Sequence, residues 1–165
     1  MEDWSNAPVF GHSDDTRPVK VRPSAYAVIA DANGCVAIVK APDGVFLVGG
    51  GVEPGETPEE AVMREAREEC GFAVRVGACI ARAVQHADSI AERTQFEKRS
   101  TFFEATIVDD GACVAEPGHE LCWVDPAVAP TLLAHPSHGW AVSRWRELPQ
   151  SRYGESPSES PNNDH

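Results

Sequence analysis

Residues 50–72 constrain the fold most strongly, because a glycine-rich loop leads there into a clearly delimited helix. Thr57 and Glu60 have the spacing of a capping box, with Pro58 at the first helical position, where its missing N–H is harmless. Gly71 is placed to take the left-handed conformation that ends many helices. The sequence therefore predicts a helix that begins at Pro58 and ends just before Gly71.

At about 100° per residue, this helix has an apolar arc and a neighbouring acidic arc. The apolar arc consists of Val62, Met63, Ala66 and Cys70. The acidic arc carries Glu65, Glu68 and Glu69, and the helix contains no lysine to balance them. Like charges at this spacing destabilise a helix by about 0.2–0.5 kcal/mol per pair. Hard divalent cations prefer carboxylate oxygens, so a metal would turn this repulsion into a binding site, whereas the alternative is a solvated acidic surface.

The same stretch resembles, position by position, the signature of the Nudix hydrolase family, and of its MutT-like members. The signature reads Gly, five residues, Glu, seven residues, Arg-Glu, an apolar residue, any residue, Glu-Glu, any residue, Gly and an apolar residue. Here its positions hold Gly50, Glu56, Arg64, Glu65, Ala66, Glu68, Glu69, Gly71 and Phe72. Two departures are the small Ala66 and Leu47-Val48-Gly49-Gly50 in place of the usual Leu-Pro-Gly-Gly, and neither removes a charged group. A looser resemblance extends from about Arg22 to Leu148, and the arrangement is similar to bacterial members of unassigned substrate.

The resemblance implies divalent-metal-dependent hydrolysis of a phosphoanhydride bond in a nucleoside diphosphate linked to another group, with Mg²⁺ or Mn²⁺. It implies that Glu65, Glu68, Glu69 and the carbonyl of Gly50 hold the metal. Metal-bound water would then attack without a covalent intermediate. Arg64 and Glu56 could pair across the junction between loop and helix and orient the cluster.

The general base stays open, because family members use either a glutamate of the signature or one from a later segment. The later candidates are Glu97, Glu104, Glu116 and Glu120, of which Glu120, three residues before Trp123, is preferred. Arg22 and Lys40 could reach phosphates from the sheet, because cations must offset the charge of the substrate. His86 and His119 could contact the nucleotide, although a lone histidine is more often structural.

The apolar runs predict an α/β fold. Ala25–Ala30 and Cys35–Val39 are apolar at consecutive positions, so their strands should be buried on both faces and covered by helices on both sides of the sheet. Together with the resemblance, this predicts a Nudix-like α/β/α sandwich with a mixed central sheet, the acidic helix on one side and C-terminal helices on the other. The other predicted strands are Val19–Arg22 (an edge strand closed by Pro23), Val45–Val48, Ala73–Ala83, Arg99–Val108 and Glu120–Val124.

The sequence also predicts a loop and two helices in the later part of the chain. Gln85–Gln95 is polar and is predicted to be a loop over the site. A helix is expected over Pro126–Ala134, interrupted at Pro130. Another should start near Ser137, with an apolar stripe of Ala141, Val142, Trp145 and Leu148.

The composition of the chain limits the domain organisation and the classes of partner that we expect. We expect an extended N-terminal arm over residues 1–17, one domain over 18–148 and a disordered tail over 149–165. The net charge of −12 argues against nucleic-acid or anionic-membrane partners, and no apolar run approaches a transmembrane span. Five scattered cysteines predict free thiols in the cytoplasm. A homodimer is compatible with the sequence.

The substrate is the least constrained feature. Markers that the family resemblance would associate with ADP-ribose or dinucleoside polyphosphates, a proline or a tyrosine downstream of the signature, are absent between Ala73 and Glu116. Nucleoside triphosphates, including oxidised ones, are left as the default. The alternative function is a nucleotide-binding sensor or interaction domain with little hydrolytic activity, although such a domain need not keep all the charged residues of the signature.

Overall fold

The computed structural model describes residues 2–109 and 115–149, so most of the predicted tail and Cys113 lie outside the described residues. Within these ranges seven strands form a mixed sheet in the order β1-β5-β6-β2-β4-β3-β7. The elements along the chain are β1 (Val9–Phe10), β2 (Val19–Ile29), β3 (Val36–Ala41), β4 (Gly44–Gly51), α1 (Pro58–Cys70), β5 (Ala73–Ser89), β6 (Thr94–Asp109), β7 (Glu120–Val124), α2 (Ala129–Leu132) and α3 (Pro136–Glu147).

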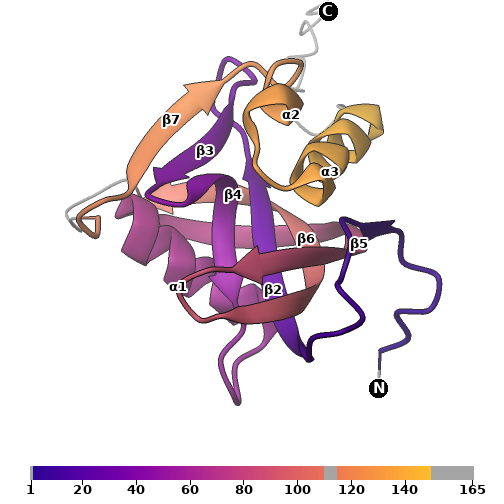
Figure 1. Ribbon diagram of the computed structural model, residues 1–165. Helices are drawn as coiled ribbons and strands as arrows, with labels where there is room; N and C mark the ends of the chain where they lie inside the picture. Colours follow the sequence, from indigo (N-terminus) through magenta and orange to yellow (C-terminus); the bar gives the residue numbers. More distant parts are fainter. Residues whose placement is uncertain (1, 110–114, 150–165) are drawn as a thin grey trace, which may run out of the picture.

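Two hydrophobic cores lie on opposite faces of the sheet, and they follow the alternation of β2. Ala25, Ala27 and Ile29 pack in the core that contains the buried face of α1. Tyr26 and Val28 pack in the core that contains α2 and α3. Figure 1 shows α1 and the α2–α3 pair on opposite sides of the strands. The predicted α/β/α sandwich with a mixed central sheet is confirmed.

The predicted bounds and caps of α1 are confirmed. The Thr57 hydroxyl accepts a hydrogen bond from the Glu60 N–H at 3.1 Å. Gly71 has a φ of 74° and donates its N–H to the carbonyl of Arg67. The predicted apolar arc is wrong at one position, because Met63 is 40% exposed while Ala61 is fully buried. The face of α1 that packs against the core therefore includes Ala61 and excludes Met63.

The prediction that Pro23 closes an edge strand is wrong. β2 continues through Pro23 to Ile29 and pairs in parallel with β6 along its whole length. On the other side of β2, pairing with β4 begins only at Ser24. Pro23 thus lies in the half of β2 that has a single strand neighbour, where its missing N–H leaves no ladder bond unmade.

The prediction of a loop over Gln85–Gln95 is also wrong. β5 runs to Ser89 and β6 begins at Thr94, so only residues 90–93 form the turn. The two glutamines that make this stretch look polar are buried strand residues. The Gln85 side-chain oxygen accepts a hydrogen bond from the Ser137 N–H at 3.1 Å, which links β5 to the start of α3.

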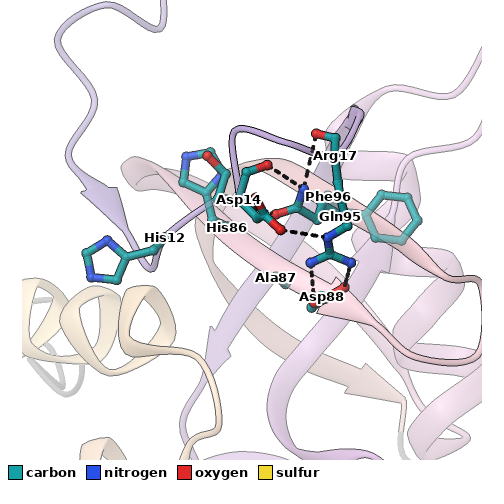
Figure 2. Close-up of a pocket in the computed structure, with 9 residues that line it drawn as sticks. His12, Asp14, Arg17, His86, Ala87, Asp88, Gln95 and Phe96 are labelled. Carbon is teal, nitrogen blue, oxygen red and sulfur yellow. Dashed lines mark hydrogen bonds and ion pairs between the residues drawn. The ribbon is translucent and has the colours of Figure 1, made fainter.

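Part of the predicted N-terminal arm belongs to the sheet. β1 pairs in parallel with β5 at Val84 and Gln85, and the ring of Phe10 lies 5.7 Å from that of Trp140. Further along the arm, the Gln95 side chain accepts from the Asp14 N–H and donates to the Asp14 carbonyl (Figure 2). A buried glutamine of β6 therefore fastens this segment to the domain.

The C-terminal helices differ from their predicted bounds. α2 is a single turn, and Pro130 lies in its first turn instead of interrupting a longer helix, because a proline near a helix start gives up no hydrogen bond. α3 begins at Pro136 and buries Ala141, Val142 and Trp145 as predicted. None of the helices within the described ranges is long and apolar enough to span a membrane.

Candidate active site

The glycines that the sequence places in a loop form the end of β4, and they bring backbone against the acidic face of α1. A Cβ atom added at Gly50 would lie 2.6 Å from a carboxylate oxygen of Glu65. One added at Gly49 would lie 2.1 Å from the Ala25 carbonyl oxygen, and Gly49 has a φ of 149°. Glycine is therefore required at Gly49 by the strand pairing, whereas at Gly50 a larger residue would displace the Glu65 carboxylate.

Arg64 links the glycine strand to the acidic face of α1. Its Nε and Nη2 donate to the two carboxylate oxygens of Glu56 at 2.8 and 3.0 Å, and Nη2 also donates to the Gly51 carbonyl. Its Nη1 donates to Glu65 at 3.0 Å and to Glu68 at 3.3 Å. The hydrogen bonds from Arg64 lower the pKa of Glu56 to about 2, so this pair stays charged at neutral pH. Arg64 thus fixes the end of β4 relative to the carboxylates.

Glu65, Glu68 and Glu69, here called the carboxylate cluster, are short of positive charge. Glu69 is only 8% exposed, and one of its oxygens accepts a hydrogen bond from the Gly49 N–H at 2.9 Å. Burial raises the pKa of Glu69 to about 8, and it also raises the pKa of Glu65. Neighbouring carboxylates add to both shifts. A cation placed in the cluster would relieve this repulsion.

Glu116 is the candidate base that the structure brings to the cluster. Its N–H donates to the Glu68 carbonyl at 2.8 Å, and its charge contributes to the raised pKa values of Glu65 and Glu69. The Nδ1 of His119 lies 3.9 Å from the Glu116 carboxylate. Two candidates named from the sequence, Glu116 and His119, therefore sit together on the segment before β7.

The other three candidate bases lie in different surroundings. Glu120, the one preferred from the sequence, is on β7 in register with Lys40 of β3. Glu97 pairs with Arg99 at 2.9 Å on β6. Glu104 alternates with residues of β6 that face α1, so its side chain is on the opposite face of the sheet.

The donors of the cluster fit a hard divalent cation, although their present partners would have to change. Among the described residues, no three His, Cys, Asp or Glu side chains are already arranged as a metal site. The Nη1 group of Arg64 instead lies between the carboxylates of Glu65 and Glu68, as a shared cation would. All available side-chain donors are carboxylate oxygens, the type that Mg²⁺ and Mn²⁺ prefer.

A cavity of about 740 Å³ lies on the α2–α3 face of the sheet. This cavity, called the sheet pocket below, is lined by Arg22, Asp43, Phe46, Phe96, Lys98, Ala134, His135 and residues 87–92. The guanidinium of Arg22 lies 5.3 Å from the centre of the Phe96 ring. The ammonium of Lys98 lies 3.3 Å from Nε2 of His135. The pocket therefore combines two cations with aromatic walls.

Of the three substrate-binding residues named from the sequence, only Arg22 lines the sheet pocket. Lys40 is an exposed residue of β3, opposite Val45 and Glu120. His86 lines a separate cavity of about 260 Å³ beside the N-terminal segment (Figure 2), and its buried Nδ1 has no hydrogen-bond partner among the residues that the structure describes.

Sequence reasoning missed Lys98, although a signal was present. Phe96, Lys98, Ser100 and Phe102 occupy alternate positions of β6, so they share one face of the strand. The predicted strand starts at Arg99, whereas β6 starts at Thr94, so the prediction leaves out the first part of this alternation. A strand beginning at Thr94 would have placed Lys98 beside Arg22.

The model of the NUDIX domain family matches residues 20–145, which is most of the chain. The chain belongs to the Nudix family. It is therefore a Nudix-type pyrophosphohydrolase. The nucleoside triphosphatase NudI of Salmonella schwarzengrund is 32% identical over 108 residues, covering 57% of this chain and 75% of the relative.

Solved Nudix structures share the fold at lower sequence identity. The E. coli dihydroneopterin triphosphate pyrophosphohydrolase superposes with a TM-score of 0.63 at 23% identity, covering 76% of this chain and 97% of that protein. A MutT protein from Methanosarcina mazei gives a TM-score of 0.61 at 21% identity, covering 81% and 96% of the two chains. At these identities the structures support the fold alone.

Because His135 is buried, we expect this Nudix domain to become less stable as the pH falls. Burial, together with the charge of Lys98, lowers the pKa of His135 from 6.5 to about 4. Between pH 6.5 and about pH 4, His135 binds a proton in the unfolded chain but not in the folded chain. The contribution of neutral His135 to stability is therefore fully present above pH 6.5 and is lost as the pH falls toward 4. The His135 contribution to the free energy of unfolding should fall by about 2 kcal/mol between pH 8 and pH 5.

Urea unfolding at pH 8, 6.5 and 5 would measure this dependence, with His135→Gln as the comparison. Glutamine can still accept a hydrogen bond from Lys98 but does not titrate. The wild-type protein should lose about 2 kcal/mol more than the variant over this range. Equal losses would show that His135 is not the group responsible. The buried His138, whose pKa is also lowered by burial, is present in both proteins and cancels in the comparison.

Proposed function

We propose that this chain hydrolyses a phosphoanhydride bond of a nucleoside diphosphate derivative, using Mg²⁺ or Mn²⁺ and an activated water. The observation that carries the proposal is the carboxylate cluster, held by Arg64 against the glycine end of β4. A solvated acidic surface would not need a buried Glu69 bonded to the backbone, nor an arginine that joins three glutamates and a carbonyl.

The carboxylate cluster and the residues around it have separate proposed roles. Glu65, Glu68 and Glu69, together with the Gly50 carbonyl, would hold the cation. When bound, the cation offsets charge on the phosphate oxygens and lowers the pKa of water. Glu56 neutralises Arg64 and keeps its guanidinium in place, so that Gly51 and Glu65 keep their positions. Because Gly50 has no side chain, the Glu65 carboxylate can lie directly against the main chain there.

We propose Glu116, rather than the Glu120 that the sequence favours, as the residue that accepts a proton from the attacking water. Glu116→Gln should lower kcat by about 10²-fold or more, in the range of general-base contributions, while Glu120→Gln changes it by less than about twofold. Steady-state kinetics at saturating metal would measure both. A large loss of kcat in Glu120→Gln with a near-normal kcat in Glu116→Gln would reverse the assignment. Small losses of kcat in both variants would indicate that a glutamate of the carboxylate cluster accepts the proton.

The substrate class is proposed from the cations and from a relative. The nucleoside triphosphatase NudI shares 32% identity with this chain, and the chain lacks the downstream markers of other substrate classes. We therefore propose nucleoside triphosphates, normal or oxidised, as substrates. Arg22 would contact the part of the substrate that reaches the sheet pocket. Lys40 and His86 lie outside that pocket and are not assigned a role in binding.

A product-release screen tests the proposal. Normal and oxidised nucleoside triphosphates, nucleotide sugars, ADP-ribose and dinucleoside polyphosphates would each be incubated with Mg²⁺, with Mn²⁺ and with EDTA. Inorganic phosphate, pyrophosphate and nucleotide products would be measured. We expect metal-dependent release from the triphosphates. Silence across the panel, combined with thermal stabilisation by a nucleotide, would instead support the sensor function.

Cellular location and assembly are separate proposals. Cys35, Cys70, Cys79 and Cys122 are free thiols, which supports a reducing compartment, and we propose the cytoplasm. A disulfide found by mass spectrometry in protein from its native cells would contradict this. The homodimer stays a prediction that sedimentation velocity would test.

A further inference from the structure

Arg22 and Lys98 are neighbours on one face of the sheet. They are direct register partners in the parallel pair of β2 and β6, so their side chains leave the sheet at the same level. Both line the sheet pocket. Arg22 is held over the Phe96 ring, and Lys98 is half-buried beside His135. Two positive groups thus converge on one cavity from adjacent strands.

Within the described part of the chain, no carboxylate forms an ion pair with either cation. The Lys98 ammonium lies beside the neutral ring of His135, and an ammonium has two further protons to donate. Burial and the charge of Arg22 lower the pKa of Lys98. Three carboxylates also line the cavity. Asp88 is paired with Arg17 at 2.8 Å, whereas Asp43 and Glu92 are exposed and act on Lys98 only at longer range. The pair is therefore an incompletely neutralised positive site.

The cation pair is close to the carboxylate cluster, across a single strand. Gly50 faces Glu65 on the α1 side, whereas Gly51 faces Arg22, whose Nε would lie 2.9 Å from an added Cβ. The Cα atoms of these consecutive glycines are ~3.8 Å apart. β3 pairs with β4 only as far as Leu47, so no described strand covers the edge of Val48–Gly51 that faces away from β2. The Gly49 N–H and the Gly51 carbonyl are bonded instead to Glu69 and Arg64, so the two sites adjoin the same short stretch of β4.

We propose that Arg22 and Lys98 form an anion subsite that binds a second phosphate group of the substrate, separate from the anhydride at the carboxylate cluster. This rests on the proposed hydrolase function and narrows its substrate class. Arginine offers a planar fork for phosphate oxygens, and lysine adds a point charge with free donors. A substrate with phosphates on both sides of the bond that is cut would use both sites. A nucleotide sugar with a neutral distal group would leave the subsite empty.

The first test measures binding without catalysis. Pyrophosphate would be titrated calorimetrically into the full-length protein in EDTA, so that no metal contributes. Lys98→Met should weaken binding at least fivefold, and Lys98→Arg should stay within about twofold of wild type, as expected for a site that needs the charge. Lys40→Met, which removes an exposed lysine outside the pocket, should have no effect. Asp43→Asn should tighten binding, because it removes a negative charge from the cavity wall.

Each outcome of the titration bears on the proposal. Equal binding by wild type and Lys98→Met, or no wild-type binding at millimolar pyrophosphate, would overturn it. Circular dichroism and urea unfolding would verify that Lys98→Met is folded, and the Lys98→Arg variant, which keeps the charge, provides a second comparison. Because hydrolysis is not measured here, this result can fail independently of the proposed enzymatic activity.

Competition identifies the source of the phosphate group. Nucleoside 5′-monophosphates and 3′-monophosphates would be compared as competitors of pyrophosphate in EDTA. If the terminal phosphates of a 5′-polyphosphate occupy the subsite, pyrophosphate should bind more tightly than either monophosphate. Selective competition by the 3′-monophosphate would assign the subsite to a ribose phosphate. If Lys98→Met impairs all competitors equally, the subsite recognises phosphate without regard to its attachment.

Discussion

Glu68→Gln should lower kcat by about 10²-fold or more while leaving the fold intact. The substitution keeps the shape of the side chain but removes a negative charge from the carboxylate cluster, and a loss of about 3 kcal/mol in stabilising the transition state corresponds to this factor. Glu68 is partly exposed, and its side chain bonds Arg64 at 3.3 Å, so little packing depends on it. Steady-state kinetics over a range of Mg²⁺ concentrations would separate a loss of turnover from a weaker metal dependence.

Glu59→Gln is the matched control for this variant. Glu59 is an exposed residue of the first turn of the same helix, so the same chemical change occurs there away from the cluster. We expect its activity to stay within about twofold of wild type. Normal turnover in Glu68→Gln, or a comparable loss in both variants, would contradict the role of the cluster.

Gly49→Ala should be the most destabilising single change in the site, lowering the free energy of unfolding by about 3–5 kcal/mol. The added methyl group would meet backbone atoms on β2, the Ala25 carbonyl oxygen at 2.1 Å and the Tyr26 Cα at 2.6 Å. These atoms belong to a central strand pair and cannot move aside cheaply. The φ of 149° is also unfavourable for alanine. Urea unfolding monitored by circular dichroism would give the value.

Gly50→Ala provides a comparison in which we expect a small effect on stability and a large effect on activity. Its added methyl group would meet only the carboxylate end of Glu65, a side chain that can rotate away. We expect a stability loss of about 1 kcal/mol and a large loss of turnover, because the displaced Glu65 belongs to the cluster. If Gly50→Ala retained full activity, the position of Glu65 against β4 would not matter for catalysis. If Gly49→Ala were as stable as wild type, the strand pairing there would be wrong.

The sequence was most informative where structure depends on local chemistry. The bounds of α1 follow from Thr57, Pro58 and Gly71, whose effects act within a single turn of helix. The turn after β2 behaves likewise, because the Asp31 side chain accepts from two backbone N–H groups and Gly34 has a φ of 78°. Such features could be predicted because every interacting partner lies within a few residues.

Features that depend on distant partners could not be predicted in the same way. Gln85 and Gln95 look like loop residues until Ser137 and Asp14, far away in the sequence, supply their hydrogen-bond partners. The position of Glu116 beside the cluster depends on its backbone bond to Glu68, which no spacing rule indicates. These contacts are set by the packing of the sheet, and polarity alone gives the opposite expectation.

The parallel pairing of β2 with β6 has a consequence for how the chain folds. Val19 pairs with Gln95 and Ile29 with Ala105, partners separated by nearly half the chain. β3, β4, α1 and β5 all lie in the loop that this pairing closes. On a ribosome, β2, β4 and α1 can meet early, but the centre of the sheet stays incomplete until β6 has emerged. We therefore expect slow, late consolidation of the sheet, as for other topologies rich in distant contacts.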